Sequence, residues 1–246
     1  MQHRSKKIKK SFFIILVVLI VLSGDSAIYL GNYYHSVDVE KYMNGSSEVS
    51  VEKFDKGWFF DGAGEEKALI FYPGAKVATE AYAPLMYQLT ESGIDCFLVD
   101  MPFHMAFFGM NRAEEIMQEY NYEAWYLGGH SLGGAMAANF AADYVEDHTD
   151  GIRGLLLLAA YPTKDLSTSD MSVVTVYGSE DGVLNMDKIV AGRELMPQDY
   201  KEVCIEGGNH AQFGSYGTQK GDGTAAIPAE EQWARTVEVF VGDESE

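Results

Sequence analysis

Residues 125–134 read WYLGGHSLGG, and this stretch decides how the rest of the chain is interpreted. An apolar run leads into Gly129-His130-Ser131-Leu132-Gly133, a G-x-S-x-G pattern that occurs once in the chain. Small residues follow at positions 133, 134, 135, 137 and 138, so that two elements could approach closely here. We therefore expect a strand to end and a helix to begin at Ser131, with the serine hydroxyl exposed on a tight turn at the edge of a sheet.

Outward from this stretch, strand-like and helix-like segments alternate along the chain. The run 154–160 is wholly apolar, as expected of a central parallel strand that is covered on both faces. Alternation of this kind predicts an α/β fold with a doubly wound, mostly parallel sheet. The remaining expected strands are 48–54 and 58–61 (a hairpin), 68–72, 96–100, 125–127, 172–177 and 200–205, and the expected helices are 79–91, 113–120, 132–144 and one opened by Pro228.

A serine hydroxyl needs a base to act as a nucleophile, and the base needs an orienting carboxylate. In a sheet of this type the partners follow in the order serine, acid, histidine, each after a later strand. The strand 172–177 is followed by Glu180-Asp181, and the strand 200–205 is followed by a loop that contains His210. We expect Ser131 as nucleophile, His210 as base and Asp181 as acid, with Glu180 in reserve; His130 is interpreted as a packing residue.

Acyl transfer also needs N–H donors aimed at the developing oxyanion. One is the backbone N–H of Leu132, directly after the nucleophile. The other is expected from the loop after the strand 68–72, which reads Pro73-Gly74-Ala75-Lys76. We favour the Ala75 N–H, and Lys76 is the alternative if the register differs by one residue.

The substrate pocket is expected to be open. Only residues 159–171 separate two consecutive strands, and this segment is too short to form a helical lid. Phe103, Phe107 and Phe108 follow the strand 96–100 and are expected to form part of the pocket wall, where aromatic side chains suit an acyl group. A loop packed into the core is the alternative interpretation of these rings.

The N-terminus has the pattern of an export segment. The first ten residues carry five basic side chains and no acidic one, and the apolar run 12–22 follows. Extended to residue 30, this segment is long enough to span a membrane, while Gly24 and Ser26 also permit cleavage as a signal. We expect a signal anchor at 1–31, a linker at 32–45 and the α/β domain at 46–246, with the domain outside the cytoplasm; a secreted, cleaved form and a buried helix are the alternatives.

Charge limits the classes of partner. The whole chain has 18 basic and 37 acidic side chains; without its first ten residues it keeps 13 basic against 37 acidic, a net charge of −24. A domain with this much negative charge repels nucleic acid and the headgroups of anionic lipids. We therefore expect no nucleic-acid partner, and expect a small acyl substrate together with a membrane contact through the N-terminal segment.

Other chemistries have weak support. The six His and two Cys residues show no metal-ligand spacing, so neither a metal nor another cofactor is expected. Residues 221–226, GDGTAA, imitate a dinucleotide fingerprint, but no strand directly precedes them, and we interpret them as a loop. Cys96 and Cys204 fall on strands near opposite edges of the expected sheet, too far apart for a disulfide, which predicts two unpaired buried thiols.

Four separated motifs in this chain resemble a known family. They are FYPGAKV at 71–77, MPF at 101–103, GHSLGG at 129–134 and GNHAQFG at 208–214. Together they resemble the small bacterial "alpha/beta hydrolase fold-5" family over residues 46–241. The resemblance implies the doubly wound fold and the triad Ser131, Asp181 and His210. It implies no particular substrate.

These observations lead to an expected function. We expect a serine hydrolase, in particular a carboxylesterase that acts on small or accessible acyl esters through an acyl-enzyme. An acyltransferase with the same triad and a non-catalytic binding module on this fold are the alternatives. Neither the natural substrate and its acyl-chain length nor the oligomeric state follows from the residues.

Overall fold

The fold is described from a computed structural model, which describes residues 31–64, 66–148 and 151–243. The chain divides into two compact units, Met1–Tyr33 and Tyr34–Glu246, and the second carries every feature discussed below. The expected signal anchor lies outside the described residues, apart from its last position. Within the described part of the chain, no helix is both long enough and apolar enough to cross a membrane.

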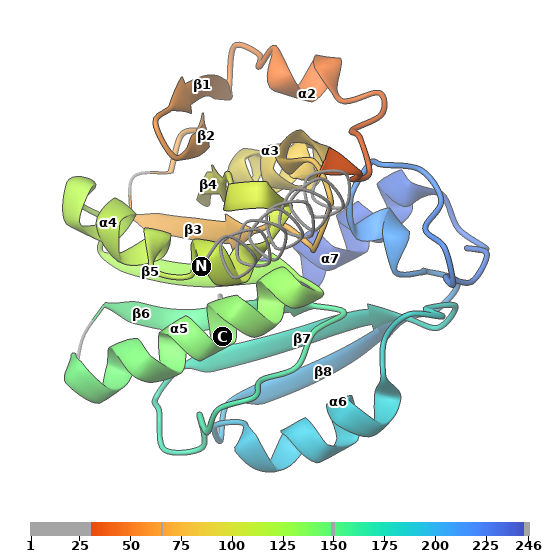
Figure 1. The fold of residues 1–246 in the computed structure, drawn as a ribbon. Coiled ribbons are helices and arrows are strands. Elements are labelled where there is room, and N and C mark those ends of the chain that lie inside the picture. The colour runs from red at the N-terminus through yellow and green to blue at the C-terminus, as the bar shows by residue number, and fades with distance from the viewer. Residues whose placement is uncertain (1–30, 65, 149–150, 244–246) are drawn as a thin grey trace, which may run out of the picture. The chain divides into compact units, whose positions relative to one another are not determined.

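The second unit is built on one eight-stranded sheet with the strand order β1-β2-β4-β3-β5-β6-β7-β8 (Figure 1). β2 pairs antiparallel with β1 and with β4, and all other neighbouring strands are parallel. The predicted α/β fold is thereby confirmed. The strands are β1 (Ser50–Phe54), β2 (Gly57–Asp61), β3 (Lys67–Tyr72), β4 (Asp95–Val99), β5 (Ala124–His130), β6 (Ile152–Leu158), β7 (Ser172–Gly178) and β8 (Tyr200–Ile205).

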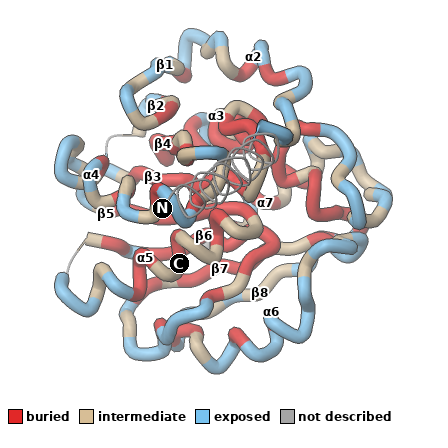
Figure 2. The backbone as a smooth tube through the Cα atoms, in the orientation of Figure 1, coloured by how far each residue is buried: buried red, intermediate tan, exposed pale blue. Residues whose placement is uncertain are grey.

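Helices cover both faces of the sheet, and each face has its own apolar core. The core on one face packs against α3 (Ala83–Glu91) and α7 (Ala229–Asp243), and that on the other face packs against α4 (Arg112–Glu119) and α5 (Leu132–Asp147). The central strands are buried on both sides, whereas α6 (Met186–Gly192) presents much of its surface to solvent (Figure 2). This double coverage explains why β3 and β6 consist of nearly continuous apolar runs.

The register of the parallel strands brings their carboxyl ends to one edge of the sheet. Tyr72 of β3 is paired with Gly129 of β5, and His130 is paired with Leu158 of β6. Gly178 of β7 is in turn paired with Ile205 of β8. The loops after β3, β5, β7 and β8 therefore emerge together, which is the usual position of a site in an open α/β sheet.

The segment expected as a linker is packed onto the domain instead. Tyr34 forms a parallel bridge with Val77 in the loop after β3, and the short helix α2 (Glu40–Met43) buries Tyr42 against Trp233. The compact unit thus begins at Tyr34 rather than at residue 46. A four-residue helix is too short to leave a periodic apolar pattern, which is why the sequence did not indicate it.

Two other details differ from expectation. The helix expected from Thr79 starts as a 3-10 turn, Thr79–Tyr82, in which Thr79 is buried and makes no capping bond, and α3 follows from Ala83. Of the two cysteines, Cys96 is buried but Cys204 is exposed. The reason is topological: β8 is an edge strand, so it is covered less completely than the central strands. Both thiols are free, as predicted.

The different exposure of the two thiols predicts that only one reacts in the native protein. Burial raises the pKa of Cys96, and burial with help from Glu206 and Glu202 raises that of Cys204. We expect a disulfide reagent to titrate one thiol slowly at neutral pH and faster as the pH rises, because the thiolate is the reacting form. Both thiols should react in denaturant, and Cys204→Ser should remove the native reaction. Equal native reaction of both thiols would contradict this placement.

Candidate functional site

Ser131 lies on a strained turn between β5 and α5. Its backbone adopts φ 54° and ψ −121°, a backbone conformation that residues other than glycine rarely adopt. The turn is fastened by the Ser131 N–H, which donates to Leu158 O at 2.9 Å. The helix begins so close to β3 that a Cβ on Gly133 would lie 2.1 Å from Tyr72 O. Glycine at 133 is therefore required for this approach, and the predicted strand-turn-helix context of Ser131 is present.

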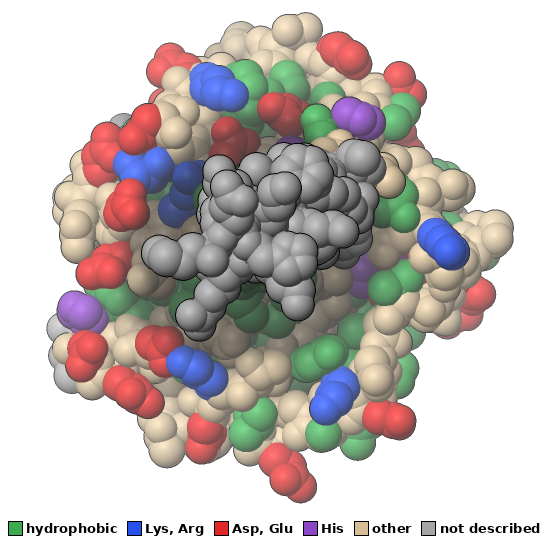
Figure 3. Space-filling view, in the orientation of Figure 1, with side chains coloured by type: hydrophobic (Ala, Val, Ile, Leu, Met, Phe, Trp, Pro, Cys, Tyr) green, Lys and Arg blue, Asp and Glu red, His purple; other side chains and the backbone are tan. Residues whose placement is uncertain are grey.

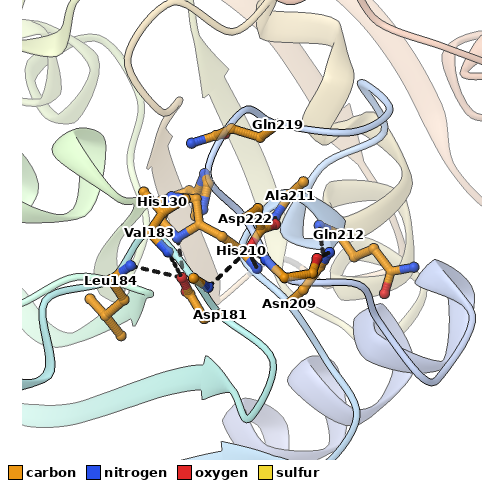
Figure 4. A network of polar contacts seen from close by, with 12 residues as sticks. His130, Asp181, Val183, Leu184, Asn209, His210, Ala211, Gln212, Gln219 and Asp222 are labelled. Carbon is orange, nitrogen blue, oxygen red and sulfur yellow. Dashed lines mark hydrogen bonds and ion pairs between the residues drawn. The ribbon is translucent and has the colours of Figure 1, made fainter.

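Asp181 and His210 are brought together from the loops after β7 and β8 (Figure 4). His210 Nδ1 lies 2.8 Å from Asp181 Oδ2, and each side chain is only 2% exposed. The other carboxylate oxygen accepts the N–H groups of Val183 at 2.8 Å and Leu184 at 2.7 Å. These bonds hold the carboxylate toward the ring, so that the ring N–H is on Nδ1 and Nε2 can act as an acceptor. The reserve candidate, Glu180, is exposed and bonds to Ser179.

His130 is buried directly beside His210, with ring centroids 4.4 Å apart. Burial, aided by the neighbouring His210, holds the pKa of His130 well below its ordinary value, so His130 is a neutral packing residue. Its Nδ1 lies 2.7 Å from the hydroxyl of Tyr82, which also accepts the Gly74 N–H at 3.0 Å. The Tyr82 hydroxyl therefore links the loop after β3 to His130, the residue before the turn at Ser131.

Tyr82 was missed in the sequence analysis. Nothing in its local pattern distinguishes it from an ordinary core tyrosine, and its side chain is fully buried. Burial also raises the pKa of its hydroxyl, which keeps the proton available for His130. The only hint in the sequence is a glycine at position 74: a Cβ there would lie 2.8 Å from both the Tyr82 hydroxyl and His130 Nδ1.

The two alternatives for the second N–H donor, Ala75 and Lys76, are distinguished by their present hydrogen bonds. The Lys76 N–H donates to His104 O at 2.8 Å, and Lys76 itself has φ 59°. Its N–H is thus occupied, which disfavours the register alternative. Neither the Leu132 N–H nor the Ala75 N–H makes a hydrogen bond within the described part of the chain. Both remain available for a developing negative charge near Ser131.

Ser131 and His210 line one cleft of about 260 Å³. Its other walls combine three alanines with a few larger side chains; the lining is Leu132, Ala135, Ala159, Ala160, Tyr161, Val183, Leu184 and Asn185. The segment 159–171, expected to be too short for a lid, contains no helix. A hydroxyl on a strained turn, an imidazole oriented by a carboxylate and two nearby N–H groups are together suited to attack on a carbonyl carbon.

The three phenylalanines expected in the pocket wall are not among the residues that line this cleft. Phe103, Phe107 and Phe108 are 57%, 47% and 53% exposed, and they contact one another in an aromatic cluster after β4. Phe103 and His104 have positive φ values, which bend the chain so that His104 O reaches the Lys76 N–H. The cluster thus belongs to the surface beside the loop that carries Ala75.

No metal centre competes with this site within residues 31–64, 66–148 and 151–243. No group of three or more His, Cys, Asp or Glu side chains is arranged there to hold a metal ion. Acidic side chains are spread around the visible face of the molecule, with fewer basic ones among them (Figure 3). This distribution agrees with the acidic composition of the chain.

The Tyr82 link predicts a measurable loss of stability. Tyr82→Phe leaves the Gly74 N–H and His130 Nδ1 without a partner, and each stranded buried group costs about 1–3 kcal/mol. We expect the free energy of unfolding in urea to fall by about 2–6 kcal/mol in total. Tyr87→Phe is the matched control, because the Tyr87 hydroxyl makes no hydrogen bond in the described part of the chain and its ring packs on Tyr42. Equal stability of both variants would contradict the link.

Comparisons with known proteins agree with this architecture. A search of curated proteins gave no significant match. Solved structures with a similar fold include a putative hydrolase from Agrobacterium vitis S4 (13% identity, 79% of this chain and 98% of that chain, TM-score 0.59). Others are carboxyl esterase 2 from the mycorrhizal fungus Tuber melanosporum (12%, 85% and 89%, TM-score 0.60) and a thermostable esterase from Pseudomonas putida ECU1011 (16%, 83% and 85%, TM-score 0.54). The profile of one family matches residues 68–234, more than half of the sequence, and the chain therefore belongs to the alpha/beta hydrolase family.

Proposed function

We propose that this protein is a carboxylesterase that cleaves small or accessible acyl esters through a covalent acyl-enzyme. The observation that carries the proposal is the buried Asp181–His210 bond, at 2.8 Å, whose histidine lines the same cleft as the strained Ser131. A structural ion pair would not need a serine in a rare backbone conformation beside it. The esterases among the similar folds support the same chemistry by analogy.

The proposed reaction proceeds in two halves. His210 Nε2 takes the proton of Ser131 as its Oγ attacks the ester carbonyl, and the Leu132 and Ala75 N–H groups hold the oxyanion. Collapse of the tetrahedral intermediate breaks the ester bond, and His210 returns the proton to the departing alcohol. A water molecule, activated by His210, then attacks the acyl-enzyme and releases the carboxylic acid. Asp181 remains ionised throughout and stabilises the imidazolium.

The cleft favours compact acyl groups. Ala135, Ala159 and Ala160 leave room next to the nucleophile but no long tunnel, because the cleft measures about 260 Å³. A longer chain would have to extend onto the surface, where the cluster of Phe103, Phe107 and Phe108 provides apolar contact. Short-chain and medium-chain esters are therefore the proposed substrate class.

Labelling with a fluorophosphonate probe tests the nucleophile. We expect the wild type to be labelled and to hydrolyse short p-nitrophenyl esters, and Ser131→Ala to lose labelling and at least about 10³-fold in kcat/KM. Ser92→Ala is a matched control, since that exposed serine only bonds to Gln88 O at the end of α3. Unlabelled wild type, or equal labelling of Ser131→Ala, would overturn the proposal. Product analysis with an added alcohol separates hydrolysis from acyl transfer to that acceptor.

We also propose that the catalytic unit lies outside the cytoplasm, attached by its N-terminal segment. The basic run in the first ten residues and the apolar run 12–22 support this, because basic flanks stay on the cytoplasmic side. N-terminal sequencing of the exported protein should find Met1 or Gln2 for an anchor, whereas Ala27 would indicate a cleaved signal. Recovery of the whole protein from the cytoplasm would contradict both forms.

A further inference from the structure

Asp222 lies in the loop that precedes α7, within residues 221–226, which the sequence analysis interpreted as a simple loop. Its carboxylate accepts four backbone N–H groups. One oxygen accepts from Gly182 at 3.1 Å, from His210 at 3.2 Å and from Gly223 at 2.8 Å. The other oxygen accepts from Ala211 at 2.8 Å. Figure 4 shows the carboxylate of Asp222 next to the backbone that carries His210.

Three of these bonds, those from Gly182, His210 and Ala211, connect the loops that carry the proposed acid and base. Gly182 directly follows Asp181, and His210 is the base itself, so that one carboxylate holds the backbone on both sides of the Asp181–His210 bond. The two loops are also tied nearer the strand ends, where the Glu180 N–H donates to Gly208 O at 2.8 Å. Asp222 adds a second connection, farther from the strand ends and next to the Asp181 and His210 side chains.

Close packing supports the same connection independently of the hydrogen bonds. A Cβ on Gly223 would lie 2.0 Å from Glu180 O, and a Cβ on Gly182 would lie 2.6 Å from Gly221 O. The loop that bears Asp222 and the loop that bears Asp181 therefore approach each other backbone to backbone. Glycine at 182 and at 223 leaves the space that this approach needs.

We propose that Asp222 is a positioning residue that sets the geometry of the Asp181–His210 pair, an inference that rests on the proposed esterase function. Asp222 is not among the residues that line the cleft, so it acts through the two loops and not on the substrate. A carboxylate suits this place because it offers two oxygens with several lone pairs and no donor. An asparagine offers one acceptor oxygen, and its NH₂ group would face backbone N–H groups.

The test is Asp222→Asn in the full-length protein, measured with p-nitrophenyl esters. We expect kcat to fall by about 10- to 100-fold while KM stays within about twofold, because a shift of about 1 Å in catalytic groups lowers the rate by this order without changing the substrate contacts. The rate of fluorophosphonate labelling should fall in parallel, since it also depends on His210.

Asp95→Asn is the matched control. Asp95 is a buried carboxylate, whereas Asp222 is half-buried, and it also accepts a backbone N–H, from Gly62 at 2.9 Å; it lies at the opposite end of the sheet, at the start of β4. Its loss should lower stability and leave kcat of the folded fraction unchanged. A merely structural role for Asp222 would give the same pattern as Asp95→Asn, and that result would overturn the proposal.

A second variant keeps the test decisive if Asp222→Asn does not fold. Gly223→Ala retains the carboxylate but forces the loop away from Glu180 O, and we expect the same fall in kcat at nearly constant KM. Wild-type kcat in folded Gly223→Ala would also overturn the positioning role. Failure of the esterase proposal is recognised separately, because then the wild type itself would show neither labelling by the probe nor ester hydrolysis.

Discussion

The close approach of β5, α5 and β3 at Ser131 is the constraint on which the rest of the site depends. Glycine at 133 lets the helix begin in contact with Tyr72 O at the end of β3. The serine between strand and helix has a strained backbone conformation. The same approach brings the Leu132 N–H next to the loop that carries Ala75. The proposed nucleophile and N–H donors are thus placed by backbone packing rather than by flexible side chains.

The electrostatics of the site depend on a carboxylate, Asp181, and on a second histidine, His130, that is kept neutral. The Asp181 carboxylate bonds to the His210 ring, and two N–H groups hold its other oxygen. His130, although its ring is only 4.4 Å from that of His210, is held neutral by burial and adds no competing positive charge. A charged His130 would oppose the imidazolium on which the proposed reaction depends. The Tyr82 bond to His130 therefore serves both the geometry and the charge of the site.

The sequence could predict the parts of this site that follow from strand order and local motifs. Ser131, Asp181 and His210 each lie in the turn or loop that follows a strand, so that a correct strand assignment was sufficient to place them at one edge of the sheet. Tyr82 and Asp222 could not be found in this way, because their roles come from contacts with segments far away along the chain. The helix at residues 40–43 is too short to show a period, and the exposure of Cys204 depends on which strand lies at the edge.

A site assembled from separate loops needs cross-connections that do not follow the chain. The strands align the loops only as far as their last paired residues, such as Gly178 and Ile205. Beyond that point, Tyr82 fastens the donor loop to the turn at Ser131, while Asp222 fastens the acid loop to the base loop. The segment 159–171 contains no helix that could press these loops together from above. Two buried or half-buried side chains from outside the proposed triad thus supply rigidity to the proposed site.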